Sequence, residues 1–85
     1  MARTVRILLF ASAREAVGRS ELLREVPLEG MALREMLEEL GQEYPRLRRV
    51  SAVSRFVLNG EYVPGRNGRL APGDELAIHP PYSGG

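Results

Sequence analysis

The chain has 85 residues, no cysteine, one histidine and a formal net charge of +1, and arginine is its only basic residue. This length allows one small domain, and the composition excludes disulfides, clustered zinc ligands, a thiol nucleophile and a lysine Schiff base. The balanced charge offers no attraction to nucleic acid and no apolar run is long enough for a signal peptide or membrane span, so we expect a cytoplasmic protein.

The first two predicted elements form a hairpin. Residues 5–10 alternate as a strand, with Val5, Ile7 and Leu9 on one face and Leu8 and Phe10 on the other. Residues 21–26 predict a second strand that Pro27 ends. We expect residues 11–19 between them to form a wide loop that contains Gly18.

The middle of the chain predicts one helix and no second one. Apolar residues recur at positions i, i+3, i+4 and i+7, which gives a single buried stripe; they are Leu33, Met36, Leu37 and Leu40. Gly41 suits the helix C-terminus and Pro45 prevents continuation. The basic run of Arg46, Arg48 and Arg49 is expected to lie in a solvated loop.

The remaining segments complete an α+β fold. Residues 56–63 predict two strands joined by a type I′ turn at Asn59-Gly60, and residues 75–79 predict the last strand. We expect polar loop and turn structure between them, at residues 64–74. A mixed sheet of four to five strands would then carry one main helix on one face and leave the other face partly open.

The sequence is poorly equipped for catalysis by itself. It holds no Gly-rich phosphate loop and no serine-histidine-aspartate set with spare members. His79 is favoured as a structural or interface residue, and Glu38 and Glu39 point in different directions on the predicted helix.

The C-terminus offers a different chemistry. Residues 80–85 read Pro-Pro-Tyr-Ser-Gly-Gly and directly follow the last predicted strand, so we divide the chain into a domain at 1–79 and a tail at 80–85. Pro80 and Pro81 stiffen the root of the tail, while Gly84 and Gly85 keep its tip narrow enough for a confined channel. Simple fraying is the common alternative for a glycine-rich terminus.

Over nearly its whole length the chain resembles the small subunits of molybdopterin synthase, which are ubiquitin-like β-grasp sulfur carriers. The resemblance rests on short motifs in a fixed order; these are Leu9-Phe10-Ala11, Arg14-Glu15, Gly18, Asn59-Gly60, Gly73-Asp74-Glu75 and residues 79–85. Each motif is weak alone, and their joint order with a Gly-Gly end is specific.

The resemblance implies that the protein is a cosubstrate whose acids and bases belong to its partners. A ubiquitin-activating-like adenylyltransferase would use ATP to adenylate Gly85, and a persulfide donor would then leave a thiocarboxylate there. The sulfur would pass to a pterin precursor on the large synthase subunit, in a heterotetramer of two small and two large subunits. No cofactor is expected to bind this chain. Pro80, Pro81, Tyr82, Ser83 and Gly84 would form the part of the tail that the partners bind.

The resemblance also suggests which residues face the large subunit. Arg14 matches a family position in the loop, with a solvated loop arginine as the alternative. Tyr62 and His79 lie where the family tends to place bulky apolar residues, and the polar His79 departs from that pattern. Leu8 and Phe10 are further candidates, with ordinary core packing as the alternative. Three rival functions stay open: sulfur supply to thiamine thiazole synthesis or tRNA thiolation, conjugation to lysines as a protein modifier, and a binding module with an incidental tail.

Overall fold

The computed structural model describes residues 3–81. The chain forms the strands β1 (Thr4–Leu9), β2 (Glu21–Glu25), β3 (Met31–Ala32), β4 (Arg55–Leu58), β5 (Glu61–Val63), β6 (Arg69–Leu70) and β7 (Glu75–His79). Its helices are α1 (Ala11–Val17), α2 (Leu33–Glu43) and α3 (Pro45–Ala52). None of the helices in residues 3–81 has the length and apolar character that a membrane crossing requires.

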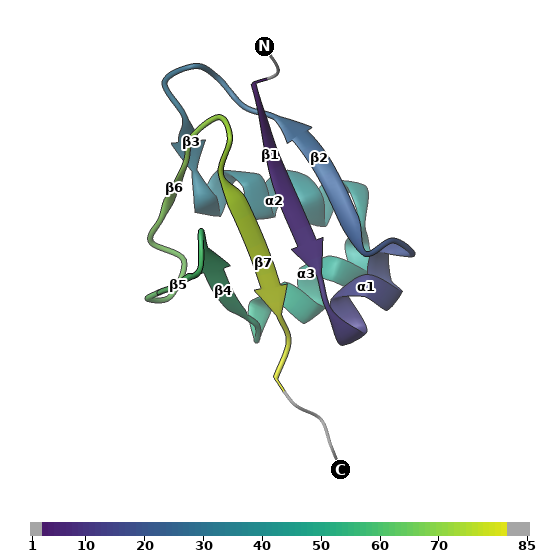
Figure 1. The fold of residues 1–85 in the computed structure, drawn as a ribbon. Helices are drawn as coiled ribbons and strands as arrows, with labels where there is room; N and C mark the ends of the chain where they lie inside the picture. The colour runs from purple at the N-terminus through teal and green to yellow at the C-terminus, as the bar shows by residue number, and fades with distance from the viewer. Residues whose placement is uncertain (1–2, 82–85) are drawn as a thin grey trace.

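The main sheet has five strands in the order β2-β1-β7-β4-β5 (Figure 1). The central strands β1 and β7 are parallel, and the other neighbours are antiparallel. The expected hairpin of the first two strands is confirmed, as is the turn at Asn59-Gly60, where both residues have positive φ. The predicted α+β fold with a mixed sheet is therefore correct.

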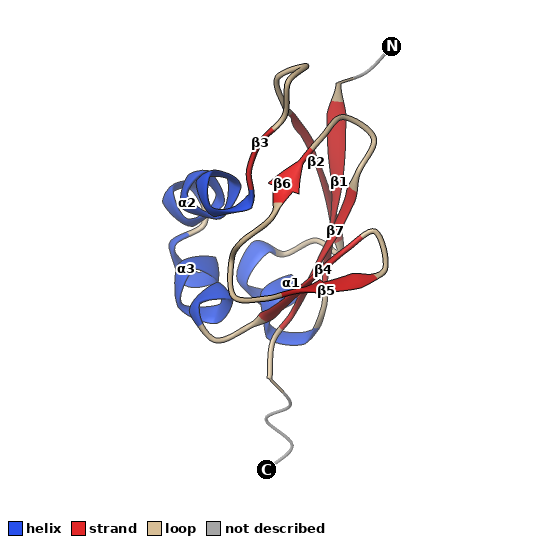
Figure 2. Ribbon diagram, turned by 90° about the vertical axis from the view of Figure 1, so that its left-hand side faces the viewer, coloured by secondary structure: helices blue, strands red, loops and turns tan. Residues whose placement is uncertain are grey.

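The core lies between the sheet and the helices (Figure 2). Val5, Ile7 and Leu9 of β1 are almost fully buried on the helix side. The four residues of the predicted apolar stripe are buried along α2, which confirms α2 as the main helix. Burial of this kind stabilises a fold by about 25 cal/mol per Å² of apolar surface.

Two further helices correct the sequence prediction. Residues 11–17, expected in a loop, form α1, which ends at Gly18 and buries Ala13 against the core. The segment lacks a capping side chain and a long apolar stripe, so its helix depends on that tertiary packing. It packs against α3 at the lower end of the sheet in Figure 1.

The second correction concerns residues 45–52, which form α3. Pro45 does stop the preceding helix, and it also occupies the first turn of α3, where its missing N–H costs no hydrogen bond. Arg46, Arg48 and Arg49 therefore lie on a helix, with Leu47 buried beneath them. The preceding helix continues past Gly41 to Glu43.

Gly41 has a packing role. A Cβ built on this buried glycine would lie 3.3 Å from the Cβ of Arg48 on α3, tighter than an ordinary contact. The glycine thus lets α2 and α3 approach closely, and it does not end the helix as expected.

A small second sheet was also missed. Strands β3 and β6 pair antiparallel, with Met31 opposite Leu70 and Ala32 opposite Arg69. Two-residue strands carry too little alternation to be recognised from sequence. Leu70, expected in a turn, is fully buried in this pair.

Candidate functional site

The face of the main sheet opposite the helices, called here the open face, carries a row of four residues across four strands. Leu8 pairs with Ala77, Ala77 with Val57, and Val57 with Tyr62, so their side chains share one face of the pleat. No helix covers this row (Figure 2). Tyr62, at the edge, is 69% exposed.

At the lower end of this face, Phe10 stacks on His79. The ring centroids lie 4.5 Å apart and the ring planes differ by 9°. Phe10 follows β1 and His79 ends β7, and because these strands are parallel both residues lie at the same end of the sheet. Phe10 remains 43% exposed, so the stack presents aromatic surface to the solvent.

A cavity of about 340 Å³ joins the row to the root of the tail. Its lining residues come from β4, β5 and β7 and from the segments just before β4 and just after β7; they are Val53, Arg55, Tyr62, His79, Pro80 and Pro81. Val53 is 65% exposed, which adds a further apolar contact at this end. The structure thus places Tyr62, His79 and the two prolines around one hollow.

The chain leaves the fold directly below this cavity. Strand β7 ends at His79, as expected, and Pro81 is exposed. Tyr82, Ser83, Gly84 and Gly85, the remaining predicted tail residues, lie outside the described residues.

Arg14 follows Phe10 of the aromatic stack in the chain, and its backbone N–H donates a hydrogen bond of 3.4 Å to the Phe10 carbonyl oxygen. It is exposed on α1, and its carbonyl oxygen accepts a hydrogen bond of 2.7 Å from the Gly18 N–H. Helix α1 lies at the same end of the sheet as the root of the tail (Figure 1). Arg14 is not among the residues that line the cavity.

Some residues of this surface, among them Val57 and Arg55, were not predicted from the sequence. Val57 and Arg55 alternate with the buried Phe56, which was a signal that they face away from the core. The register that aligns Val57 with Leu8 and Ala77 could not be read from the sequence, because β4 and β1 are joined only through β7.

Within residues 3–81, no three histidine, cysteine or acidic side chains gather in a way that could hold a metal ion. The surface instead combines aromatic and aliphatic groups with one arginine, Arg55, and one histidine. Aromatic and arginine side chains are the ones that protein interfaces use as anchors.

Comparison with known proteins identifies a family model and relatives that match nearly the whole chain. The ThiS family model matches residues 7–85. The molybdopterin synthase sulfur carrier subunit of Dictyostelium discoideum is 31% identical over 86 residues, covering 100% of both chains. The human protein of that name is 39% identical over 84 residues, covering 95% of this chain and 93% of its own.

A solved structure agrees with the fold. The solution structure of small archaeal modifier protein 1 from Methanosarcina acetivorans is 30% identical and covers 100% of this chain and 98% of its own, with a TM-score of 0.78. The chain therefore belongs to the ThiS family of ubiquitin-like β-grasp proteins, together with the molybdopterin synthase sulfur carrier subunits.

Proposed function

We propose that this protein carries sulfur on Gly85 for molybdopterin synthesis. The observation that carries the proposal is that relatives named as molybdopterin synthase sulfur carrier subunits match 95% or more of this chain. The Gly-Gly end of the sequence supplies the carboxylate that such a carrier needs.

The Gly85 carboxylate is a poor electrophile and must first be activated. Attack on a carboxylate must expel oxide, so a partner adenylyltransferase first joins the Gly85 carboxylate to AMP from ATP and releases pyrophosphate. The terminal sulfur of a persulfide then attacks the carbonyl carbon and displaces AMP. A thiol then attacks the donor's sulfur in the resulting acyl disulfide, forms a new disulfide with it and releases Gly85 as the thiocarboxylate.

The open face and the cavity at the tail root form the docking surface in this proposal. Tyr62, Phe10 and Val53 are exposed apolar groups around the point where the tail leaves the fold. A large synthase subunit that covered them would hold the tail root while Gly85 reached its pterin-binding site. We propose two small and two large subunits in the complex.

The test is an intact-mass measurement. Incubated with its adenylyltransferase, ATP and a persulfide donor, the protein should gain about 16 Da, because sulfur replaces one oxygen. The control variant carries one extra alanine after Gly85, and it should keep its mass. An unchanged mass of the natural chain under these conditions would contradict the sulfur-carrier proposal.

To identify the client, the loaded protein is mixed with the large synthase subunit and a pterin precursor. Transfer should return the chain to its original mass and produce a dithiolene-bearing pterin. Transfer to a thiazole-forming enzyme or to tRNA, with none to the pterin, would contradict the molybdopterin assignment and keep the sulfur chemistry.

Protein modification is the second candidate, because a 30% identical structural neighbour is named as a small archaeal modifier protein. In that case Gly85 would form an isopeptide bond with a lysine of another protein. The chain itself has no lysine side chain to accept such a bond. Gly-Gly remnants on lysines of other proteins, found by peptide mass spectrometry, would support this second activity.

A further inference from the structure

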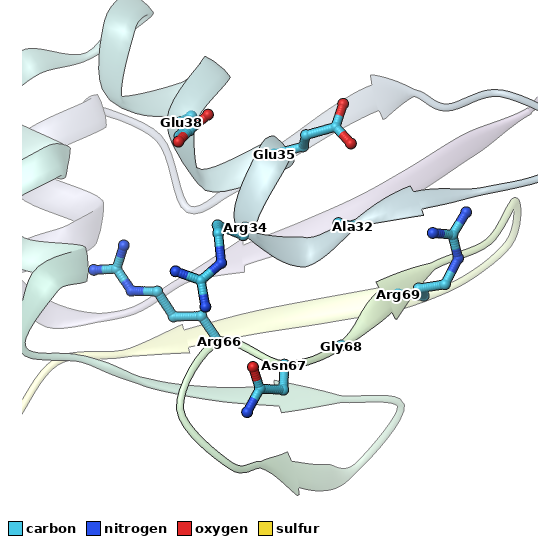
Figure 3. Close-up of a pocket in the computed structure, with 8 residues that line it drawn as sticks. All are labelled: Ala32, Arg34, Glu35, Glu38, Arg66, Asn67, Gly68 and Arg69. Carbon is cyan, nitrogen blue, oxygen red and sulfur yellow. The ribbon is translucent and has the colours of Figure 1, made fainter.

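A groove of about 540 Å³ runs between the start of α2 and the segment that leads into β6 (Figure 3). Three arginines line it, from three different places in the chain: Arg34 on α2, Arg66 in the preceding loop of β6, and Arg69 on β6. The groove shares no lining residue with the cavity at the tail root or with the row on the open face. Helix α2 lies on the side of the main sheet opposite the open face (Figure 2).

Within the described part of the chain, these arginines form no ion pair with a carboxylate. The ion pairs among residues 3–81 involve only Arg6 and Arg24. Arg66 donates one hydrogen bond of 3.3 Å to the Ser51 carbonyl oxygen, and Arg69 donates one of 3.1 Å to the Glu29 carbonyl oxygen. A guanidinium has five N–H donors, so other groups of residues 3–81 accept from only a minority of the donors on Arg66 and Arg69.

Arg34 and Arg66 line the groove from α2 and from the loop before β6. The Arg34 side chain extends from α2 toward the loop that carries Arg66 and Asn67 (Figure 3), and Glu35 and Glu38 of the same helix also line the groove. An anion bound in the groove would reduce the repulsion between guanidinium groups that line it from different elements. A carboxylate suits that position, because arginine binds carboxylates through paired hydrogen bonds.

The shape of the groove and its charges indicate the kind of ligand. The groove is open to solvent, unlike the enclosed clefts that hold small molecules. Glu38 and Arg66 also line a neighbouring cavity of about 500 Å³ that adds Arg48, so the basic surface continues toward α3. A polypeptide can follow such a surface with several carboxylates and place donors near Glu35 and Glu38.

We propose that this groove binds an acidic segment of a protein partner, with Arg34 and Arg66 as the main contacts. The site is separate from the open face, so the segment could remain bound while the tail is used elsewhere. The inference does not depend on the sulfur-carrier proposal, and its test uses the free protein.

The test is a titration followed by amide NMR with a short peptide of alternating glutamate and glycine. The largest shifts are expected at residues 34, 66 and 67, with little change at Leu8, Val57 or Tyr62. Because the contacts are charged, affinity should fall as salt is added. The same peptide with glutamine in place of glutamate should not bind.

Matched variants decide whether the site or the net charge is responsible. Arg34→Gln with Arg66→Gln should weaken binding by about tenfold, which is about 1.4 kcal/mol. Arg19→Gln with Arg46→Gln removes the same charge from exposed positions outside the groove and should change affinity less than about twofold.

Three results would overturn the proposal: no binding of the glutamate peptide, equal weakening by the two double variants, or shifts spread over the whole surface. Inorganic phosphate that produced the same local shifts at the same concentration would instead indicate a small-anion site. The amide spectrum of each free variant establishes that it is folded.

Discussion

At the scale of single residues, the open face is defined by a few exposed rings. Tyr62 presents most of its surface to solvent, and Phe10 stacks on His79 at the root of the tail. His79 departs from the apolar residue that the resemblance leads one to expect. Its stacking with Phe10 shows how an imidazole can occupy an aromatic surface at this position. Exposed rings of this kind have little effect on the stability of the free protein. They contribute strongly to the free energy of binding when a partner covers them.

Tyr62→Ala should therefore weaken binding to the large synthase subunit by about 2 kcal/mol and change the stability of the free protein by less than about 0.5 kcal/mol. Calorimetric titration and chemical denaturation measure the two effects. Leu28→Ala is the matched control, because Leu28 is 66% exposed, is absent from the cavity lining and lies outside β1, β4, β5 and β7. Equal losses of affinity in both variants would argue against the open face as the docking surface.

At the scale of elements, the short pair β3-β6 depends on Gly30. This glycine has a φ of +86° and directly precedes β3. A Cβ at this position would lie only 2.7 Å from the backbone carbonyl oxygen of Leu70. The backbone conformation and the close approach both require glycine, and Leu70 is fully buried and cannot move away freely.

Gly30→Ala should accordingly destabilise the protein by more than about 2 kcal/mol, since the clash adds to the cost of a left-handed alanine. Gly60→Ala is the comparison, because Gly60 has the same φ of +86° with open space around it. Its cost should be about 1 kcal/mol. Denaturant unfolding of both variants measures the difference, and equal values would mean that contact with Leu70 contributes nothing.

Another element-scale feature explains part of the sequence resemblance. The side-chain amide of Asn59 donates to Asp74 at 3.0 Å and its oxygen accepts the Glu75 N–H at 2.9 Å. Asp74 also accepts the Ala71 N–H at 2.8 Å. The Asn59-Gly60 and Gly73-Asp74-Glu75 motifs therefore join two turns at the far end of the sheet from the tail, which is a structural role.

At the scale of the whole molecule, the fold and the tail are separable. Among residues 3–81, the buried apolar residues extend from Val5 to Ile78, so the described core ends before Pro80. Deletion of Gly84 and Gly85 should change the free energy of unfolding by less than about 0.5 kcal/mol and abolish sulfur loading. Thermal unfolding and intact mass provide the readouts. A clear loss of stability would mean that the tail contributes to the fold.

The sequence by itself determined the parts with a strong local pattern. The alternation in β1, the apolar stripe of α2, the Asn59-Gly60 turn and the strand before Pro80 are all present as predicted. The order of short motifs also identified the family, which the comparisons confirm. Residues 82–85 carry the proposed chemistry, and their identity comes from the sequence alone.

Only the tertiary structure decided the features that depend on distant contacts. Helix α1 is stabilised by burial of Ala13, and β3-β6 joins residues nearly 40 positions apart. The row from Leu8 to Tyr62, the Phe10–His79 stack and the Arg34–Arg66 groove each bring together residues from separate elements. A sequence pattern records the periodicity of one element, whereas register and packing between elements arise only when the core forms.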